Sequence, residues 1–121
     1  MGALLYQTRG GMEASGVTFR LFGKKIDYFG PFWTTWPFAK LECYREFIIV
    51  KVWPWSVQIS IPVKEIDVVE YRRLKLWRPL RRPSLKFLHG APVANPVTFI
   101  AFSLDHAVRV LRELGVKVTD K

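Results

Sequence analysis

The amino-acid sequence predicts a mainly β domain that ends in one α-helix, and three observations support this prediction. Short stretches rich in β-branched and aromatic residues recur along the chain and are separated by Gly, Pro and charged turn residues. Residues 56–61 alternate between apolar and polar side chains, as in an antiparallel strand with one face in water. A clear helical pattern occurs only near the C-terminus. Because no helices alternate with the strands, the sequence excludes a parallel βαβ architecture.

About seven short antiparallel strands are expected from this pattern. They are placed at residues 17–22, 38–43, 47–52, 56–61, 65–73, 85–89 and 97–102. There are no internal repeats and no linker, so residues 17–121 are expected to form a single domain. We expect the strands to form a strongly bent sheet or barrel with one open end.

The helix is expected at residues 104–114. Ser103 precedes it at a natural N-cap position, and Gly115 follows it at the C′ position, where glycine is favoured. The apolar residues of this segment fall at helical spacing on one side: Leu104, Ala107, Val108, Leu111 and Leu114. An amphipathic helix needs an apolar partner, so this helix is predicted to plug the open end of the sheet, with Leu111 and Leu114 buried.

Two segments near the N-terminus look irregular. Residues 1–16 contain four glycines and no periodicity, so they are expected to lack fixed structure. Residues 28–38 contain six aromatic residues and two prolines, which favours a loop over a strand. The aromatic candidates there are Phe32, Trp33 and Trp36. We expect these rings to fold back over the core, and a partner-binding or membrane-interface patch is the alternative.

Positive charge is concentrated in one third of the chain. The net charge is +9, and the segment between Tyr71 and Leu104 holds seven basic residues and no acidic one. The candidate anion-binding residues are Arg72, Arg73, Lys75, Trp77, Arg78, Arg81, Arg82 and Lys86. Basic residues mixed with Trp and Leu suit an anionic membrane surface, and they also suit nucleic acid. The simpler interpretation is a solvated loop.

No catalytic or metal site is predicted. One cysteine and two histidines give no ligand set at metal spacing, and no catalytic serine or phosphate-binding glycine motif occurs. We therefore expect no enzyme activity, no metal and no cofactor. The single Cys43 excludes an internal disulfide and fits a reducing cytoplasm, with peripheral attachment to a membrane as an alternative.

The order of the predicted elements, strands followed by one helix, resembles the pleckstrin-homology-like superfold, and more closely bacterial PH-like and GRAM-type domains. The segments that carry the likeness are Ile61-Pro-Val-Lys-Glu-Ile-Asp-Val-Val-Glu70, Phe99-Ile-Ala-Phe-Ser103 and Leu111-Arg-Glu-Leu-Gly115. The C-terminal helix lacks the tryptophan of eukaryotic members. The basic motif of phosphoinositide-binding members is also interrupted, by the acidic residues in the series Lys40, Glu42, Arg45, Glu46 and Lys51.

The resemblance implies a fold more than a function, because this superfold serves lipid, peptide and scaffold roles. We expect a non-enzymatic cytoplasmic PH-like module. It would dock to a protein partner, including copies of itself, or to an anionic membrane surface. The alternative function is nucleic-acid binding through residues 72–86.

Overall fold

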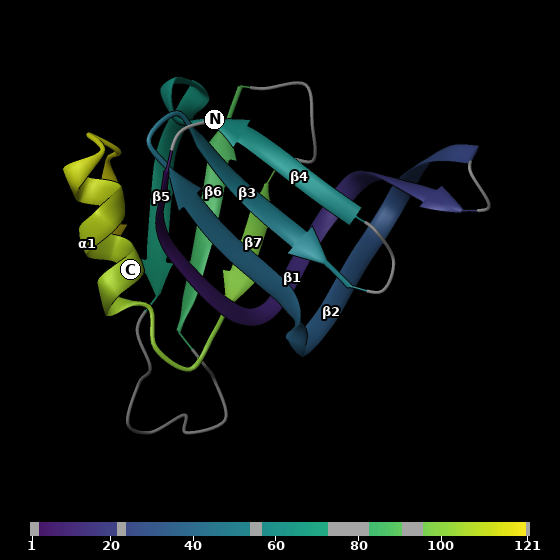
Figure 1. Cartoon of the computed structure of the whole chain (residues 1–121), viewed down its shortest axis with the longest axis horizontal. Helices are drawn as coiled ribbons and strands as arrows, with labels where there is room; N and C mark the ends of the chain where they lie inside the picture. Colours follow the sequence, from purple (N-terminus) through teal and green to yellow (C-terminus); the bar gives the residue numbers. More distant parts are fainter. Residues whose placement is uncertain (1–2, 22–23, 54–56, 73–82, 91–95, 121) are drawn as a thin grey trace.

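Eight strands form one sheet in the order β4-β3-β2-β1-β7-β6-β5-β8, and the single α-helix of the described residues comes between β7 and β8 in the chain (Figure 1). The computed structural model describes residues 3–21, 24–53, 57–72, 83–90 and 96–120. The strands are β1 (Leu4–Leu21), β2 (Lys24–Tyr44), β3 (Phe47–Val52), β4 (Val57–Pro62), β5 (Ile66–Arg72), β6 (Ser84–His89), β7 (Val97–Ile100) and β8 (Val118–Asp120). A 3-10 turn, η1 (Val63–Glu65), precedes β5, and the helix is α1 (Asp105–Glu113). The predicted mainly β fold with one C-terminal helix is confirmed.

Strand β1 joins the two halves of the sheet. One edge of β1 pairs with β2 from Leu4 to Leu21, and β2 continues the sheet into β3 and β4. Residues Gly11 to Ala14 of β1 pair with β7, which continues into β6 and β5. The neighbours in both halves are antiparallel, as predicted. The terminal strand β8 is an addition that the sequence analysis missed, and it pairs with β5 in parallel.

The core lies between the two halves and the helix. It contains alternating residues of each strand, so that the buried side chains of β4, for example, are Val57, Ile59 and Ile61. The largest fully buried side chains come from both halves: Met12, Leu41, Ile48, Ile61, Leu85, Phe87, Phe99, Leu104 and Leu111. Cys43 is part of this core, where burial raises the pKa of its thiol to about 12. This thiol therefore stays protonated at neutral pH.

Helix α1 lies against the sheet next to β5 and bridges strands from both halves (Figure 1). The ring of His106 packs against Tyr6 of β1 with centroids 4.6 Å apart. The hydroxyl of Tyr71, on β5, donates a 2.7 Å hydrogen bond to Asp105 Oδ1. Leu111 is fully buried and Leu114 is half-buried, so the expected packing of the helix is confirmed for Leu111 and only partly for Leu114.

The C-terminal end of the helix is as predicted from the sequence, and the N-terminal cap is not. The N-cap residue is Leu104, without a side-chain capping hydrogen bond, so the assignment of Ser103 as the cap is wrong. At the C-terminus Gly115 has φ of +86°. The N–H of Gly115 donates to Arg112 O, and that of Val116 donates to Leu111 O, at 3.0 Å each. This pair of bonds is a Schellman motif, which confirms the predicted role of Gly115.

The N-terminal segment is ordered, contrary to expectation. Strand β1 begins at Leu4, and Met12 is fully buried in the core. Two of the glycines that suggested disorder, Gly10 and Gly11, are required by close packing. A Cβ on Gly10 would collide with the backbone carbonyl of Ile100, and one on Gly11 would lie 2.5 Å from the carbonyl oxygen of Thr34. These glycines mark a close approach of backbones at the place where β1, already paired with β2, begins to pair with β7 on its other edge.

The aromatic segment 28–38 belongs to β2 and is not a loop. Its prolines are tolerated for two reasons. The β2–β3 ladder begins only at Ala39. At Pro31, β2 therefore has a paired strand, β1, on one side alone, and a proline is tolerated on the open edge. Pro37 lies between Thr34 and Ala39, which pair with Met12 and Gly10, so residues 35–38 bulge out of the ladder.

Candidate functional site

Four exposed aromatic side chains gather at the end of the sheet where β2 bulges. They are Trp36, Phe38, Trp53 and Phe102, and between 40% and 72% of each is exposed. The ring of Trp36 meets that of Phe102 edge-on at 5.6 Å, and the ring of Phe38 stacks on that of Trp53 at 6.4 Å. We call these four residues the aromatic end. Large rings left in water at one place on a surface are typical of interaction sites.

The backbone explains why these rings meet. The bulge at residues 35–38 turns Trp36 and Phe38 outward from the ladder. The N–H of Trp53, one residue beyond β3, donates a 2.9 Å bond to the carbonyl of Phe38 and brings the two rings together. Phe102 follows Ala101, whose N–H donates to Pro83 O at 3.2 Å. Rings from β2, from the end of β3 and from the β7–α1 connection therefore share one end of the molecule.

A row of basic residues crosses the outer face of the sheet just behind the aromatic end. Arg9 of β1 is opposite Lys40 of β2, which is opposite Lys51 of β3. We call these three residues the cationic row. Lys40 is two residues from Phe38 and Lys51 two residues from Trp53, so the row lies about 7 Å behind the stacked rings along the strands. Side chains two residues apart on a strand point to the same face.

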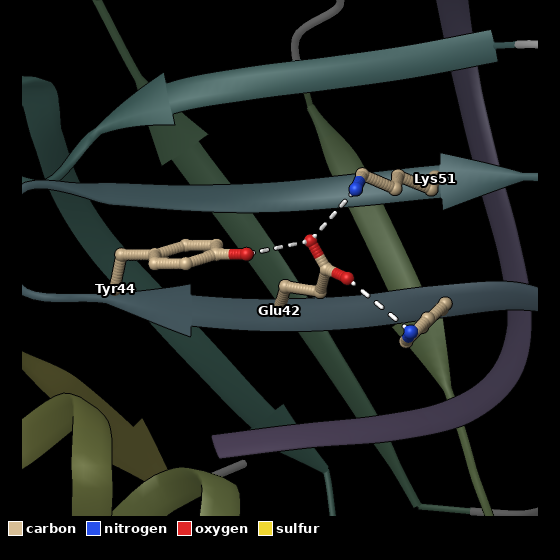
Figure 2. Close-up of polar contacts among 4 residues, drawn as sticks. Glu42, Tyr44 and Lys51 are labelled. Atoms are coloured by element: carbon tan, nitrogen blue, oxygen red, sulfur yellow. Dashed lines mark hydrogen bonds and ion pairs between the residues drawn. The ribbon is translucent and has the colours of Figure 1, made fainter. Parts of the chain in front are cut away.

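Glu42 holds the two lysines of the row in place (Figure 2). Its carboxylate lies 3.3 Å from Lys40 Nζ and 3.1 Å from Lys51 Nζ, and it accepts a 3.1 Å hydrogen bond from the Tyr44 hydroxyl. Desolvation would raise the pKa of the Glu42 carboxyl. The hydrogen bonds from Lys51, Tyr44 and Lys40 outweigh it and keep this pKa below its ordinary value of 4.5. Desolvation and the bond to Glu42 raise the pKa of the Tyr44 hydroxyl.

Replacing Glu42 by glutamine should lower the free energy of unfolding by about 1 kcal/mol at neutral pH, because its lysine partners are partly screened by water. The folded pKa lies below the ordinary value of 4.5, so the ionised carboxylate stabilises the fold above pH 4.5. That contribution disappears as the pH falls through the lowered pKa. Urea denaturation of the wild type and Glu42→Gln over a pH series measures this. A difference between the two proteins that stays constant down to acid pH would contradict the assignment.

The structure places only part of the predicted basic site. Arg72 ends β5 and is exposed, and Lys86 of β6 lies opposite Glu70 and is half-buried. Arg73, Lys75, Trp77, Arg78, Arg81 and Arg82 lie outside the described residues. Strand β7 lies between β1, which carries Arg9 of the cationic row, and the strands β6 and β5, which carry Lys86 and Arg72. Pro83, where the described chain resumes, accepts a hydrogen bond from the N–H of Ala101, the residue before Phe102.

The predicted aromatic candidates divide into two groups. Phe32 packs against the core, as expected. Trp33 is 70% exposed and Trp36 is 51% exposed, so the expectation that this chain covers them is wrong. Phe38, Trp53 and Phe102 are exposed but were not among the candidates predicted from the sequence. Phe38 could have been found, because it has the same alternation as Lys40 and Glu42 on the outward face of its strand.

Among the described residues, no group of three or more His, Cys, Asp or Glu side chains is arranged to hold a metal ion. A shallow pocket between α1 and β5 is lined by Tyr71, Asp105, Val108, Arg109, Arg112 and Glu113. Two acids and two arginines balance each other in that pocket, and Asp105 is already bonded to Tyr71. The pocket therefore favours no charged ligand.

Comparison with known proteins adds no assignment to this geometry. The sequence matches no protein-family model and no curated protein sequence. Over the residues that the structure describes, no helix has the length and apolar character needed to cross a membrane.

Proposed function

We propose that this chain is a non-enzymatic, PH-like binding module that docks through the aromatic end and the cationic row onto an extended anionic surface. The observation that carries the proposal is the position of the exposed ring pairs, Trp36 with Phe102 and Phe38 with Trp53, directly in front of Arg9, Lys40 and Lys51. Apolar rings supply contact area that leaves water on binding, and the cations select an anionic partner.

The shape of the site supports binding over catalysis. The rings project from a strand bulge, a strand end and a connection, and they do not line the pocket beside α1. Catalysis requires convergent acid, base or nucleophilic groups around a substrate. The aromatic end offers no acid, base or nucleophile, since its only polar side-chain groups are the indole N–H groups of Trp36 and Trp53. The charged groups behind it are two lysines fixed by Glu42 and an exposed Arg9. The PH-like resemblance, with its strand order followed by one helix, agrees with a binding role.

A second copy of the chain is a weaker candidate for the partner. The chain carries a net charge of +9, so two copies that meet at this end bring like charges together. An anionic surface avoids that repulsion. An acidic protein, an anionic membrane and nucleic acid all meet this requirement.

The test compares two tryptophans of equal exposure. Trp53 in the aromatic end is 72% exposed, and Trp33 outside it is 70% exposed. Trp53→Ser should weaken binding to at least one anionic surface by about tenfold, whereas Trp33→Ser should not. Binding is measured with anionic vesicles, a single-stranded oligonucleotide and polyglutamate. If the two variants bind all three alike, the aromatic end is not a binding site. Equal denaturation midpoints of both variants show that the fold is preserved.

A further inference from the structure

We infer that the surface recognised by the aromatic end is the interface of an anionic lipid bilayer, with the rings inserted and the cationic row at the level of the lipid phosphates. This inference rests on the proposed function, because it names the partner of the same site. It comes from the order of side chains along β2 and β3.

The side chains of the site form layers along β2 and β3, counted backward from the end of β3. Phe38 and Trp53 come first, then Lys40 and Lys51 two residues behind, and then Glu42. The separation of the first two layers is about 7 Å. Interfacial protein segments bury their apolar face about 5–10 Å into the boundary between headgroups and acyl chains. Rings at that depth place the two ammonium groups and Arg9 among the phosphates.

The residue types also fit this interface. Tryptophan is enriched at membrane–water boundaries, where its ring is apolar and its N–H remains in polar surroundings. Glu42 lies one layer behind the lysines and holds both Nζ atoms within 3.3 Å on the side away from the rings, so the ammonium groups are fixed behind the rings at the headgroup side (Figure 2).

Nucleic acid fits the same site less well. Bases stack on open faces of aromatic rings. Here Phe38 and Trp53 are stacked at an interplanar angle of 12°, so each ring presents one face to the other. The rings of Trp36 and Phe102 meet edge to face, so one of these two rings also has a face covered by the other. The rings project from a bulge, whereas single-stranded nucleic acid is usually bound along a positively charged groove.

Ring insertion is tested with two proteins that each contain one tryptophan. In the first, Trp33, Trp36, Trp55 and Trp77 are replaced by Phe, so Trp53 remains, and in the second Trp33 remains instead. Vesicles contain phosphatidylcholine with phosphatidylglycerol, with or without bromine on the acyl chains. We expect acyl-chain bromine to quench Trp53 fluorescence strongly and Trp33 fluorescence weakly. Equal quenching of both, or none of Trp53 in vesicle-bound protein, would overturn the inference.

The cationic row is tested with a pair of variants of equal net charge. Arg9→Gln removes a charge from the row, and Arg45→Gln removes one from the turn between β2 and β3, at the other end of these strands. Arg9→Gln should weaken vesicle binding about fivefold, and Arg45→Gln should have a smaller effect. Equal effects would mean that charge acts only at long range and that the row does not contact lipid phosphates.

The outcomes separate the inference from the proposed function. If Trp53→Ser weakens binding to the oligonucleotide or to polyglutamate but leaves vesicle binding unchanged, the proposed binding function is supported. The inference that the partner is a membrane is then wrong. If Trp53→Ser and Trp33→Ser bind every surface alike, both fail. Soluble glycerol phosphate should not displace the protein from vesicles. Full displacement would show a site for a single headgroup, which contradicts insertion at a bilayer surface.

Discussion

Replacing Gly10 by alanine should destabilise the protein by about 3 kcal/mol or more, since the added methyl group has no room. A Cβ at this position would collide with the Ile100 carbonyl and lie 2.9 Å from Cζ of the Phe99 ring. The obstacle includes backbone, which cannot move aside as a flexible side chain can. Relief therefore requires β1 and β7 to separate where they join the two halves of the sheet. Urea denaturation followed by circular dichroism measures the loss.

Gly90 provides the matched control for this substitution. The nearest atom to a Cβ at Gly90 is Glu65 Oε2 at 3.6 Å, an ordinary van der Waals contact. Gly90→Ala should therefore change the free energy of unfolding by no more than about 0.5 kcal/mol. Equal denaturation midpoints for Gly10→Ala and Gly90→Ala would show that β1 and β7 do not approach as closely as described.

Truncating Leu111 to alanine should cost about 2–5 kcal/mol, because it leaves a cavity in the core beneath the helix. Leu111 is fully buried, and its carbonyl also accepts the Val116 N–H in the Schellman motif. Alanine keeps that backbone bond, so the loss reports side-chain packing. Thermal or urea unfolding monitored by far-ultraviolet circular dichroism measures it.

Leu114 lies one turn further along the same helix and is half-buried. Leu114→Ala makes the same chemical change with less buried surface, so it should cost clearly less than Leu111→Ala. If the two substitutions cost the same small amount, α1 does not pack on the sheet through Leu111. The capping role of the helix would then be wrong.

Periodicity predicted most of the fold because it reports burial directly. Strand β3 has the bounds expected from the sequence, and β4, β5 and β6 differ from the expected bounds by a residue or two. The errors occurred where composition is ambiguous. Glycine suits a disordered segment and also suits a place where backbones nearly touch, as at Gly10. Proline suits a loop and also a bulge, as at Pro37.

The candidate site was only half predictable for a related reason. The pairing of Phe38 with Trp53 follows from two neighbouring strands whose alternation is readable in the sequence. The pairing of Trp36 with Phe102 depends on β1 lying between β2 and β7, which no local pattern specifies. The sequence therefore pointed to Trp36 but not to its partner. The three cations of the cationic row are dispersed in sequence, so no local run of charge marks them, in contrast to the basic residues after Tyr71.

The position of β1 between β2 and β7 has a consequence for the order in which the chain can fold. The hairpins β2–β3 and β3–β4 join residues that are close in sequence, so they close small loops. The β1–β7 ladder joins Gly11 to Ile100 and spans most of the chain. During synthesis the first half of the sheet can assemble early, but the β7-facing edge of β1 stays unpaired until β7 has emerged from the ribosome. Such non-local pairing slows folding and leaves a strand edge open in the nascent chain.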